Sequence, residues 1–420
     1  MRLFSGQKDK AVLAIGLLLA ILLAGAGCAR PQDPPEPEPK PSYKGTLNLW
    51  AAPGLAGSLV PQPDDAFFAE QARAFEAKHS DIKVNVRLFD SPRALEDALI
   101  TGAETPDVAF ARFLPQAAPR LANVEPILGE AAVGEYLPGA LDAFRSPGQL
   151  LGVPALLELQ VLALNEPLFR SAGVALPENG KWTREEMENN LRKLFGTGTY
   201  GLGFYQLSGY HEWWPFADGL LTPEGGIAPG AEAGFARLAQ YRKEGVLHPD
   251  TAKLTAEQTW ELFARGGFAV MPVSTWALPL LQGPDYNMTL SVAAFPGDVT
   301  VGYTYGFMLF RQPEELRLQA AAALARFLGS AENQVRLAAL TGLMPALKGA
   351  PNPFAGDPAL TRAFGFAATQ RSLPAGPAWE KAELAAGREI TLALVGGREP
   401  KAAAEAIRNL FQSAIAPATK

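Results

Sequence analysis

Two short segments hold the side chains with the most obvious chemistry. Glu158 lies in the stretch PALLELQVLALN, with leucines on both sides, where a carboxylate is costly to bury without a partner. Residues 210–219, YHEWWPFADG, bring aromatic rings, an imidazole and two carboxylates together. Carboxylates can act as general acids or bases. Beside aromatic rings, they can also hold a ligand through hydrogen bonds and ring contacts.

Catalysis by a carboxylate pair is one alternative. Glu158 and Glu212 could together form the reacting pair of a glycoside hydrolase. The distance between them is set by the tertiary structure, so the sequence leaves this alternative open. Incubation with oligosaccharides distinguishes a hydrolase from a binding protein, because a binding protein returns the sugar intact whereas a hydrolase creates new reducing ends.

Other enzyme motifs are absent from the sequence. Residues 196–201, GTGTYG, fit G-x-G-x-x-G, but they follow a helical pattern and precede a strand, the reverse of a dinucleotide site. The sequence contains neither a G-x-S-x-G nucleophile elbow nor a phosphate-binding G-x-x-x-x-G-K-[ST] loop. The histidines, His79, His211 and His248, lie far apart, so there is no H-E-x-x-H metal motif. We therefore expect a protein that is not an enzyme and that uses no metal or cofactor.

The first 28 residues have the pattern of a secretory leader followed by a cysteine. A basic start precedes the apolar run AVLAIGLLLAILLA at residues 11–24, and small residues follow it. Cys28 comes next and is the only cysteine of the 420 residues, so no disulfide can form within the chain. The site resembles a bacterial lipobox, with Gly25 where leucine is usual, which implies a signal peptide over residues 1–27 and a lipid on Cys28. The alternative is an ordinary signal peptide or uncleaved anchor with an incidental cysteine.

Residues 28–44 are rich in proline. Prolines favour extended polyproline II, so residues 29–43 can reach roughly 45 Å at ~3.1 Å per residue. We predict a tether between the lipid and a globular body, with a proline-rich recognition motif as the alternative.

The formal net charge of the chain is −6. This negative balance argues against nucleic acid or an anionic bilayer surface as the main partner.

Strand and helix patterns alternate along the remaining chain. Residues 46–50, residues 82–88 and the DVAF segment from Asp107 are typical of strands. Helical periodicity covers residues 65–79, 184–194, 230–244, 256–263, 313–328, 331–340 and 400–414. Strands separated by helices predict parallel sheets in α/β layers, and the length of the chain predicts two such lobes.

Several short motifs follow one another in a fixed order along this part of the chain. The opening TLNLW is followed by FEAKHSDIKVNV, TPDVAF and GVPALLELQVLALNEPLFRSAGV. KWTREEM, EGVLHPD, ELFARGGFAVMPVSTWAL and FLGSAENQVRLAALTGLMPAL come next. In order and spacing, these pieces resemble the extracellular solute-binding proteins of bacterial ABC importers, family 1 or maltose-binding type. The resemblance runs from residue 46 to about residue 414.

The resemblance implies an α/β fold of two lobes, similar to type II periplasmic binding proteins, joined by a hinge that the chain crosses three times. The crossings are expected near residues 154–160, 298–303 and 347–352. The N-lobe would comprise residues 45–157 and 302–348, and the C-lobe residues 158–301 and 349–420. A ligand between the lobes would stabilise a closed state, which the importer recognises.

The resemblance also implies where a ligand binds. A sugar has apolar C–H faces that suit aromatic rings and hydroxyls that suit carboxylates. Family ligand positions correspond here to Trp50, Glu158, His211, Glu212 and Trp276, with Trp213 beside them and Tyr303 at the second crossing.

Alternatives stay open for several of these side chains. Core packing is the alternative for Trp50 and for Trp276, and a buried ion pair at the hinge is the alternative for Glu158. Tyr305 and Arg112 are further candidates for the cleft. Trp182 and Trp260 are predicted to be structural, at a helix start and on a helix face.

The expected ligand is therefore a sugar or oligosaccharide, and the expected partners are the permease subunits of an ABC importer. We expect a monomer that is lipid-anchored to the cell membrane, in the periplasm or on the outer cell face. The chain departs from the maltose pattern at Ala52, Gly54, Ala111 and Leu114, so several hydroxyl contacts of maltose are missing. A peptide or polyamine binder of similar fold is the other alternative. It would need several acidic side chains in the cleft, and the supply of aromatic residues favours sugar.

Overall fold

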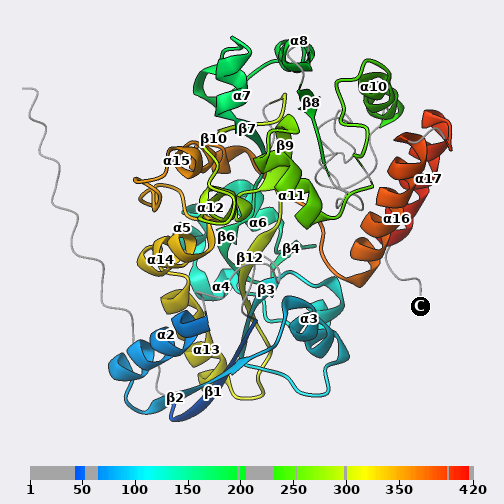
Figure 1. The fold of residues 1–420 in the computed structure, drawn as a ribbon. Helices are drawn as coiled ribbons and strands as arrows, with labels where there is room; N and C mark the ends of the chain where they lie inside the picture. Colours follow the sequence, from blue (N-terminus) through cyan, green and yellow to red (C-terminus); the bar gives the residue numbers. More distant parts are fainter. Residues whose placement is uncertain are drawn as a thin grey trace, which may run out of the picture. The chain divides into compact units, whose positions relative to one another are not determined.

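The computed structural model describes residues 43–52, 65–195, 199–204, 231–251, 253–297, 300–394 and 397–415. Within them, a six-stranded sheet has the order β13-β6-β12-β3-β1-β2 and a four-stranded sheet the order β10-β7-β9-β8 (Figure 1). Two further pairs, β11-β14 and β4-β5, have two strands each. The chain is thus built around two separate sheets, as the two-lobe prediction requires.

The six-stranded sheet begins with the predicted strands. β1 (Gly45–Ala51) pairs in parallel with both β2 (Ile82–Leu88) and β3 (Val108–Arg112). The intervening helices are α2 (Asp65–Lys78) and α3 (Pro92–Thr101), the second capped by Ser91. The alternation of IKVNVRL suits the edge strand β2, whose polar side chains reach solvent, while β3 lies inside the sheet and is mostly buried.

The sheets are mixed, so the prediction of parallel sheets is wrong in part. β12 (Thr304–Leu309) runs antiparallel to β3 and to β6 (Val153–Leu157), and β13 (Met344–Pro345) runs antiparallel to β6. The reason is the path of the chain. It leaves the sheet at the carboxyl end of β6, and β12 pairs its first residue with Leu157 at that same end, so β12 must run in the opposite direction.

The four-stranded sheet is also mixed. β7 (Gln160–Asn165) pairs antiparallel with β10 (Leu290–Ala293) and with β9 (Phe268–Ser274). β8 (Tyr200–Leu202) joins β9 in parallel, and it begins within the GTGTYG segment, so that Gly201 lies in the strand. A dinucleotide site needs a helix at this end of the motif, so the strand agrees with the rejection of such a site.

Among the described residues, the chain passes between the two sheets three times. Only Glu158 and Leu159 separate β6 from β7. The return runs from β10 through β11 (Thr300–Gly302) to β12, and the last passage leads from β13 to α15 (Pro358–Phe364), which packs on β10. These passages contain the three expected crossings. The exact limits of the two lobes remain a prediction.

The first two passages are bonded to each other through the backbone. The Glu158 N–H donates to the carbonyl of Tyr303 over 2.8 Å, and the Leu373 N–H donates to that of Gly302 over 2.7 Å. A Cβ on Gly302 would lie 1.8 Å from the Glu158 carbonyl oxygen, so the close approach of the two chains requires glycine. β14 (Gln370–Ser372) pairs in parallel with β11 beside this contact.

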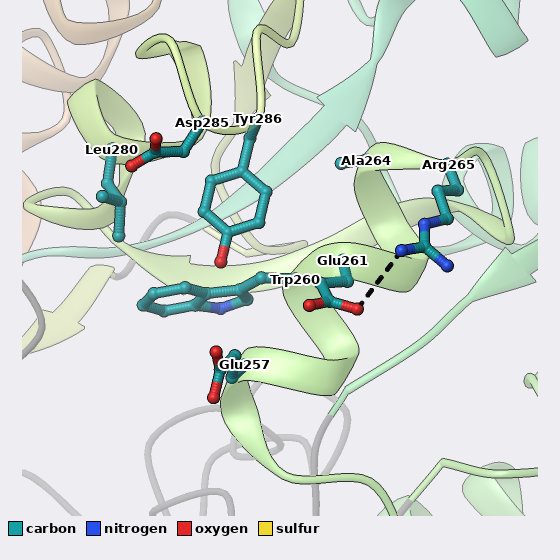
Figure 2. A pocket seen from close by; sticks show the side chains of 8 residues that line it. All are labelled: Glu257, Trp260, Glu261, Ala264, Arg265, Leu280, Asp285 and Tyr286. Carbon is teal, nitrogen blue, oxygen red and sulfur yellow. Dashed lines mark hydrogen bonds and ion pairs between the residues drawn. The ribbon is translucent and has the colours of Figure 1, made fainter.

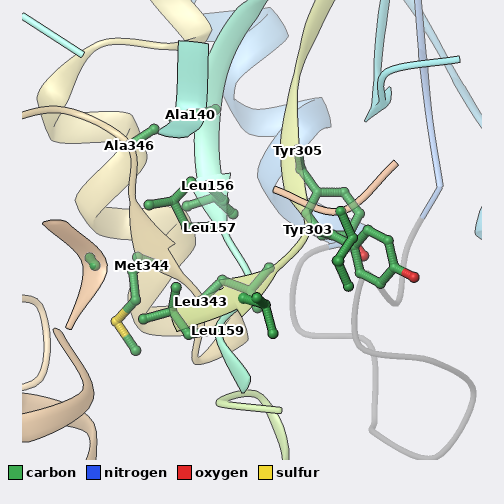
Figure 3. Packing of buried hydrophobic residues seen from close by; sticks show 14 of the residues in the cluster. Ala140, Leu156, Leu157, Leu159, Tyr303, Tyr305, Leu343, Met344 and Ala346 are labelled. Carbon is green, nitrogen blue, oxygen red and sulfur yellow. The ribbon is translucent and has the colours of Figure 1, made fainter. Parts of the chain in front are cut away.

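Apolar side chains surround the passages. Leu156 and Leu157 of β6 and Leu159 at the crossing are fully buried, as are Leu343 and Met344. Figure 3 shows these side chains packed together, with the rings of two tyrosines, Tyr303 and Tyr305, alongside. Burial of each such side chain contributes about 1.5–3 kcal/mol. The hinge region is therefore a packed core and not a loose linker.

The predicted helices are confirmed, with ends that shift by two residues at most. They are α2, α8 (Arg184–Phe195), α10 (Ala231–Lys243), α11 (Ala256–Ala264), α13 (Glu315–Leu328), α14 (Ala331–Thr341) and α17 (Pro400–Ile415). The remaining elements are short: η1 (Pro115–Arg120), α4 (Glu125–Leu128), α5 (Glu130–Gly134), α6 (Pro138–Asp142), β4 (Arg145–Ser146), β5 (Gln149–Leu150), α7 (Glu166–Ser171), η2 (Glu178–Gly180), α12 (Ala277–Gln282) and η4 (Ala367–Thr369).

One long helix was not predicted. α16 (Pro377–Leu394) lies beside α17, and both pack on α10 (Figure 1). The centre of the Trp379 ring on α16 lies 4.6 Å from that of the Phe411 ring on α17.

No described helix is both long enough and apolar enough to cross a bilayer.

Candidate functional site

Polar side chains gather where the chain passes between the two sheets. Arg112 ends β3, Glu158 follows β6, and Tyr303 and Tyr305 lie at the start of β12. α16 adds two glutamates, Glu380 and Glu383. We call these six residues the hinge cluster. The carboxyl ends of parallel strands, here β3 and β6, are where α/β proteins usually place their ligands.

Arg112 is the centre of the cluster. Its Nη2 lies 2.7 Å from Glu96 Oε1 and 2.6 Å from Glu380 Oε1, and its guanidinium carbon lies 4.8 Å from the centre of the Tyr303 ring. Burial alone would lower the pKa of Arg112, but the neighbouring Tyr305, Glu96 and Tyr303 hold it well above its ordinary value. Arg112 therefore keeps its positive charge.

Glu96 depends on Arg112. Its side chain, on α3, is only 2% exposed. Burial raises the pKa of the Glu96 carboxyl group, and the charge of Arg112 and its hydrogen bond act in the opposite direction. The pair therefore stabilises a buried carboxylate that would be costly alone.

The two tyrosines each donate to a glutamate. The Tyr303 hydroxyl donates to Glu383 Oε1 over 2.7 Å, and the Tyr305 hydroxyl donates to Glu158 Oε2 over 3.2 Å. Burial raises the pKa of Tyr303 and of Tyr305 well above the ordinary value, and the adjacent Glu383 and Glu158 raise them further. Both phenols therefore remain protonated donors at neutral pH.

Glu158 is itself buried, with 6% of its surface exposed. Besides the bond from Tyr305, its Oε1 accepts a long hydrogen bond of 3.5 Å from Gln160 Nε2. Among the described residues, no cation pairs with Glu158, so the ion-pair alternative finds no partner there. A role for Glu158 in binding a ligand remains a prediction.

A hollow of about 220 Å³ adjoins the cluster. We call it the hinge hollow. Its lining offers a guanidinium, a phenol, a carboxylate and two hydroxyls: Arg112, Tyr303, Asp142, Thr304 and Ser372, together with apolar neighbours at 113, 115, 143 and 373–375. These groups donate and accept hydrogen bonds, so the hollow suits a polar ligand that does both. Its volume is below the roughly 300–1,000 Å³ of typical ligand pockets, so it holds a small group.

The predicted site residues fall in different places. Tyr303 lines the hinge hollow, whereas Trp50 is 5% exposed and lies against Phe89, with ring centres 5.1 Å apart. Trp276 is partly exposed and packs edge-on against Trp260 at 5.8 Å. Neither tryptophan lines the hinge hollow. Four predicted functional residues lie outside the described residues: Cys28, His211, Glu212 and Trp213.

Two predictions of structural roles fit what is observed. Trp182 is 7% exposed and its Nε1 donates to the carbonyl of Ala294 over 3.1 Å. Trp260 is 4% exposed on α11, but it also lines a second hollow. Both residues are buried, as expected.

Two members of the hinge cluster were not predicted from the sequence. Glu380 and Glu383 lie on α16, a long helix that was not predicted. Glu383 is 7% exposed and lies on the same face as the buried Trp379, Ala382 and Ala386. A carboxylate within that apolar stripe was a usable signal, because such a residue is rarely buried without a partner.

Comparisons with known proteins agree with this architecture. A family model described as bacterial extracellular solute-binding protein matches residues 70–363. A search of curated protein sequences finds no match.

Solved structures share the fold at low sequence identity. The cyclic alpha-maltosyl-1,6-maltose binding protein from Arthrobacter globiformis is 16% identical, with a TM-score of 0.73 over 89% of this chain and 99% of that one. The sugar-binding protein MalE from Xanthomonas citri is 21% identical, with a TM-score of 0.73 over 88% and 97%. An ABC substrate-binding protein from Listeria monocytogenes, solved with cycloalternan, is 18% identical, with a TM-score of 0.67 over 88% and 99%. The α/β two-lobe fold is therefore the one predicted.

Proposed function

Because the chain belongs to the bacterial extracellular solute-binding proteins, we propose that it captures a sugar or oligosaccharide at the hinge and delivers it to an ABC importer. Members of this family bind solutes and do not transform them, so the chain is a binder and the glycoside hydrolase alternative is not retained. The observation that carries the proposal is the hinge hollow beside the hinge cluster, whose lining includes both donors and acceptors of hydrogen bonds.

The chemistry of the hollow supports a hydroxyl-bearing ligand. A hydroxyl can donate to Asp142 and accept from Arg112 or Tyr303, all of which line the hollow. Three solved structures of the same fold are described as binding cyclic alpha-maltosyl-1,6-maltose, cycloalternan and chitin oligosaccharide. These ligands belong to those proteins, and they support sugar as the class for this one.

The hinge cluster supplies a mechanism for coupling binding to closure. Two glutamates of α16, which packs with α10 and α17, bond to residues near the six-stranded sheet. Glu380 pairs with Arg112 at the end of β3, and Glu383 accepts from the Tyr303 hydroxyl before β12. A bound sugar would compete for these partners and replace the bonds with its own hydroxyls. The ligand would then shift the population of lobe arrangements by its differential affinity for them.

The proposal includes an anchor. A lipid on Cys28 and the tether of residues 28–44 would hold the lobes near the membrane and the permease. Cys28→Ser should move the protein from the membrane fraction to the soluble fraction when cells are fractionated and immunoblotted. A variant that stays as firmly membrane-bound as the parent contradicts the lipid anchor.

A thermal-shift screen tests the ligand class. A ligand at 100 times its Kd stabilises the folded state by about 2.7 kcal/mol, which raises Tm measurably. We expect one or more oligosaccharides to raise Tm, and to be recovered without new reducing ends. The proposal fails if peptides or polyamines raise Tm and no mono- or oligosaccharide does.

A further inference from the structure

A second hollow of about 600 Å³ lies against α11 and α12, away from the hinge cluster. We call it the outer hollow. Glu257, Trp260 and Glu261 of α11, Leu280 of α12, and Asp285 and Tyr286 of the following loop line it (Figure 2). Its volume falls within the roughly 300–1,000 Å³ of small-molecule sites. No member of the hinge cluster lines it.

α11 holds its side of the hollow firmly. Thr255 caps the helix, since its hydroxyl accepts from the Gln258 N–H over 3.3 Å and the Gln258 side chain accepts from the Thr255 N–H over 3.0 Å. Trp260, one turn further, is 96% buried and packs against Trp276. The hollow is therefore built on a capped helix and a fixed indole ring.

The outer hollow contains hydrogen-bond donors without acceptors. Among the described residues, nothing accepts from the Trp260 Nε1–H or from the Tyr286 hydroxyl. Figure 2 shows the nitrogen edge of the Trp260 ring turned to the side of Glu257, and the Tyr286 hydroxyl end over the ring. The ring centres of Trp260 and Tyr286 are 6.3 Å apart and nearly perpendicular. Both residues line the hollow, so an acceptor carried by a ligand can pair with these donors.

Acceptors lie beside these donors. Glu257 and Asp285 have no ion-pair partner in the described part of the chain, while Glu261 pairs with Arg265 at 3.5 Å on the rim. Burial raises the pKa of Tyr286, and the charges of Glu257, Glu261 and Asp285 raise it further. The hollow thus holds the carboxylates of Glu257, Glu261 and Asp285 together with the phenol.

This combination selects the class of ligand. An ammonium group only donates hydrogen bonds, so it satisfies the carboxylates and leaves the indole and phenol donors unpaired. An anion accepts from those donors and is repelled by the carboxylates. A hydroxyl does both, and a sugar ring presents several hydroxyls together. We propose that the outer hollow binds one sugar unit, beyond Trp276, of the oligosaccharide captured by the protein, an inference that rests on the proposed function for its ligand class.

The test uses the full-length protein and calorimetric titration with two series of one to six units, α-1,4-linked glucose and β-1,4-linked N-acetylglucosamine. Trp260→Phe removes the N–H and keeps a ring, and the pair Glu257→Gln with Asp285→Asn removes charge and keeps shape. Glu130→Gln, an exposed carboxylate on α5, is the matched control. Each variant's Tm is measured without sugar to confirm folding.

We expect both hollow variants to bind the longest sugars roughly three- to tenfold more weakly, as loss of one or two hydrogen bonds predicts. The shortest sugar that binds, and the control variant, should show unchanged affinity. If affinities of every length match the parent while Tyr303→Phe weakens binding, the outer site is overturned and the proposed function stands. If the hollow variants weaken binding and Tyr303→Phe does not, the hinge site is overturned instead.

Two further outcomes overturn the inference. If neither series binds, both the outer site and the sugar-binding function fail. If tetramethylammonium binds the parent and Trp260→Phe or the double variant abolishes that binding, the hollow takes a cation and the sugar assignment is wrong. An unchanged Tm in Trp260→Phe ensures that a loss of affinity does not come from unfolding.

Discussion

The hinge hollow and the outer hollow differ in how their polar groups are used. At the hinge, Arg112, Tyr303 and Tyr305 already bond to glutamates. In the outer hollow, Trp260 and Tyr286 have no such partner among the described residues. A ligand at the hinge must exchange existing bonds, so binding there couples to movement. A ligand in the outer hollow completes unmade bonds, so binding there needs no rearrangement of partners.

The largest expected effect breaks the hinge bonds. Arg112→Met leaves Glu96 buried without its cation, which should lower the free energy of unfolding by about 3–5 kcal/mol. Urea denaturation of the ligand-free protein measures this loss of unfolding free energy. Arg93→Met is the control, because Arg93 also bonds to Glu380 but is 51% exposed, and such pairs contribute about 0–1 kcal/mol. Equal small losses in both variants would show that the hinge pairs are not effectively buried.

Trp276 belongs to the outer side of this comparison, since its ring packs against Trp260 of the outer hollow. If Trp276 stacks on a sugar, Trp276→Ala should weaken binding by about 1–3 kcal/mol through lost ring contact. Calorimetry gives the affinity and a melting curve the stability. An unchanged Kd removes Trp276 from the site, and a collapse of Tm assigns it to the core.

Glu158→Gln tests whether the carboxylate serves ligand or fold. If sugar hydroxyls bond to it, the lost charge should weaken binding by about 1–2 kcal/mol. The apo protein should change little, because a glutamine oxygen can still accept from Tyr305. Melting temperature without ligand and affinity with it separate the cases. A fall of several kcal/mol in apo stability would reveal a buried ion pair and defeat the ligand assignment.

The smallest effect appears only at high pH. The folded-state pKa values of Tyr303 and Tyr305 lie above the ordinary value, so the unfolded chain loses these protons first as pH rises. The two shifted pKa values contribute fully to the free energy of unfolding below pH ~10. Above that pH the contribution falls, by at most about 1.4 kcal/mol per pH unit for each tyrosine. Tyr303→Phe should flatten the fall of unfolding free energy above pH ~10. Tyr200→Phe, a half-buried tyrosine outside the cluster, is the control, and an identical slope in both variants contradicts the assignment.

Parts of the fold were predictable because their signals are local. The alternation of residues 82–88 and the periodicity of residues 331–340 correspond to β2 and α14. The direction of β12 was not predictable, because it depends on where β6 leaves the sheet. α16 was missed because it begins directly after Pro374, Ala375 and Gly376, which are typical of a turn, and because half of its eight buried residues are alanine or glycine.

The candidate site shows the same division. Tyr303 was predicted from its place at the second crossing, and it lines the hinge hollow. Arg112 was only a further candidate, and Glu380 was not considered at all. No local pattern joins these two residues, since 268 residues separate them.

The sequence by itself determined most of the order of elements, the family and the presence of a single cysteine, because these depend on residue identities and on patterns among neighbouring residues. Only the tertiary structure decided which polar groups meet. Glu158 and Tyr305 are 147 residues apart and share a hydrogen bond because β6 and β12 pair at the hinge. Such a contact depends on long-range packing and strand register, which fix positions in space that local spacing does not encode.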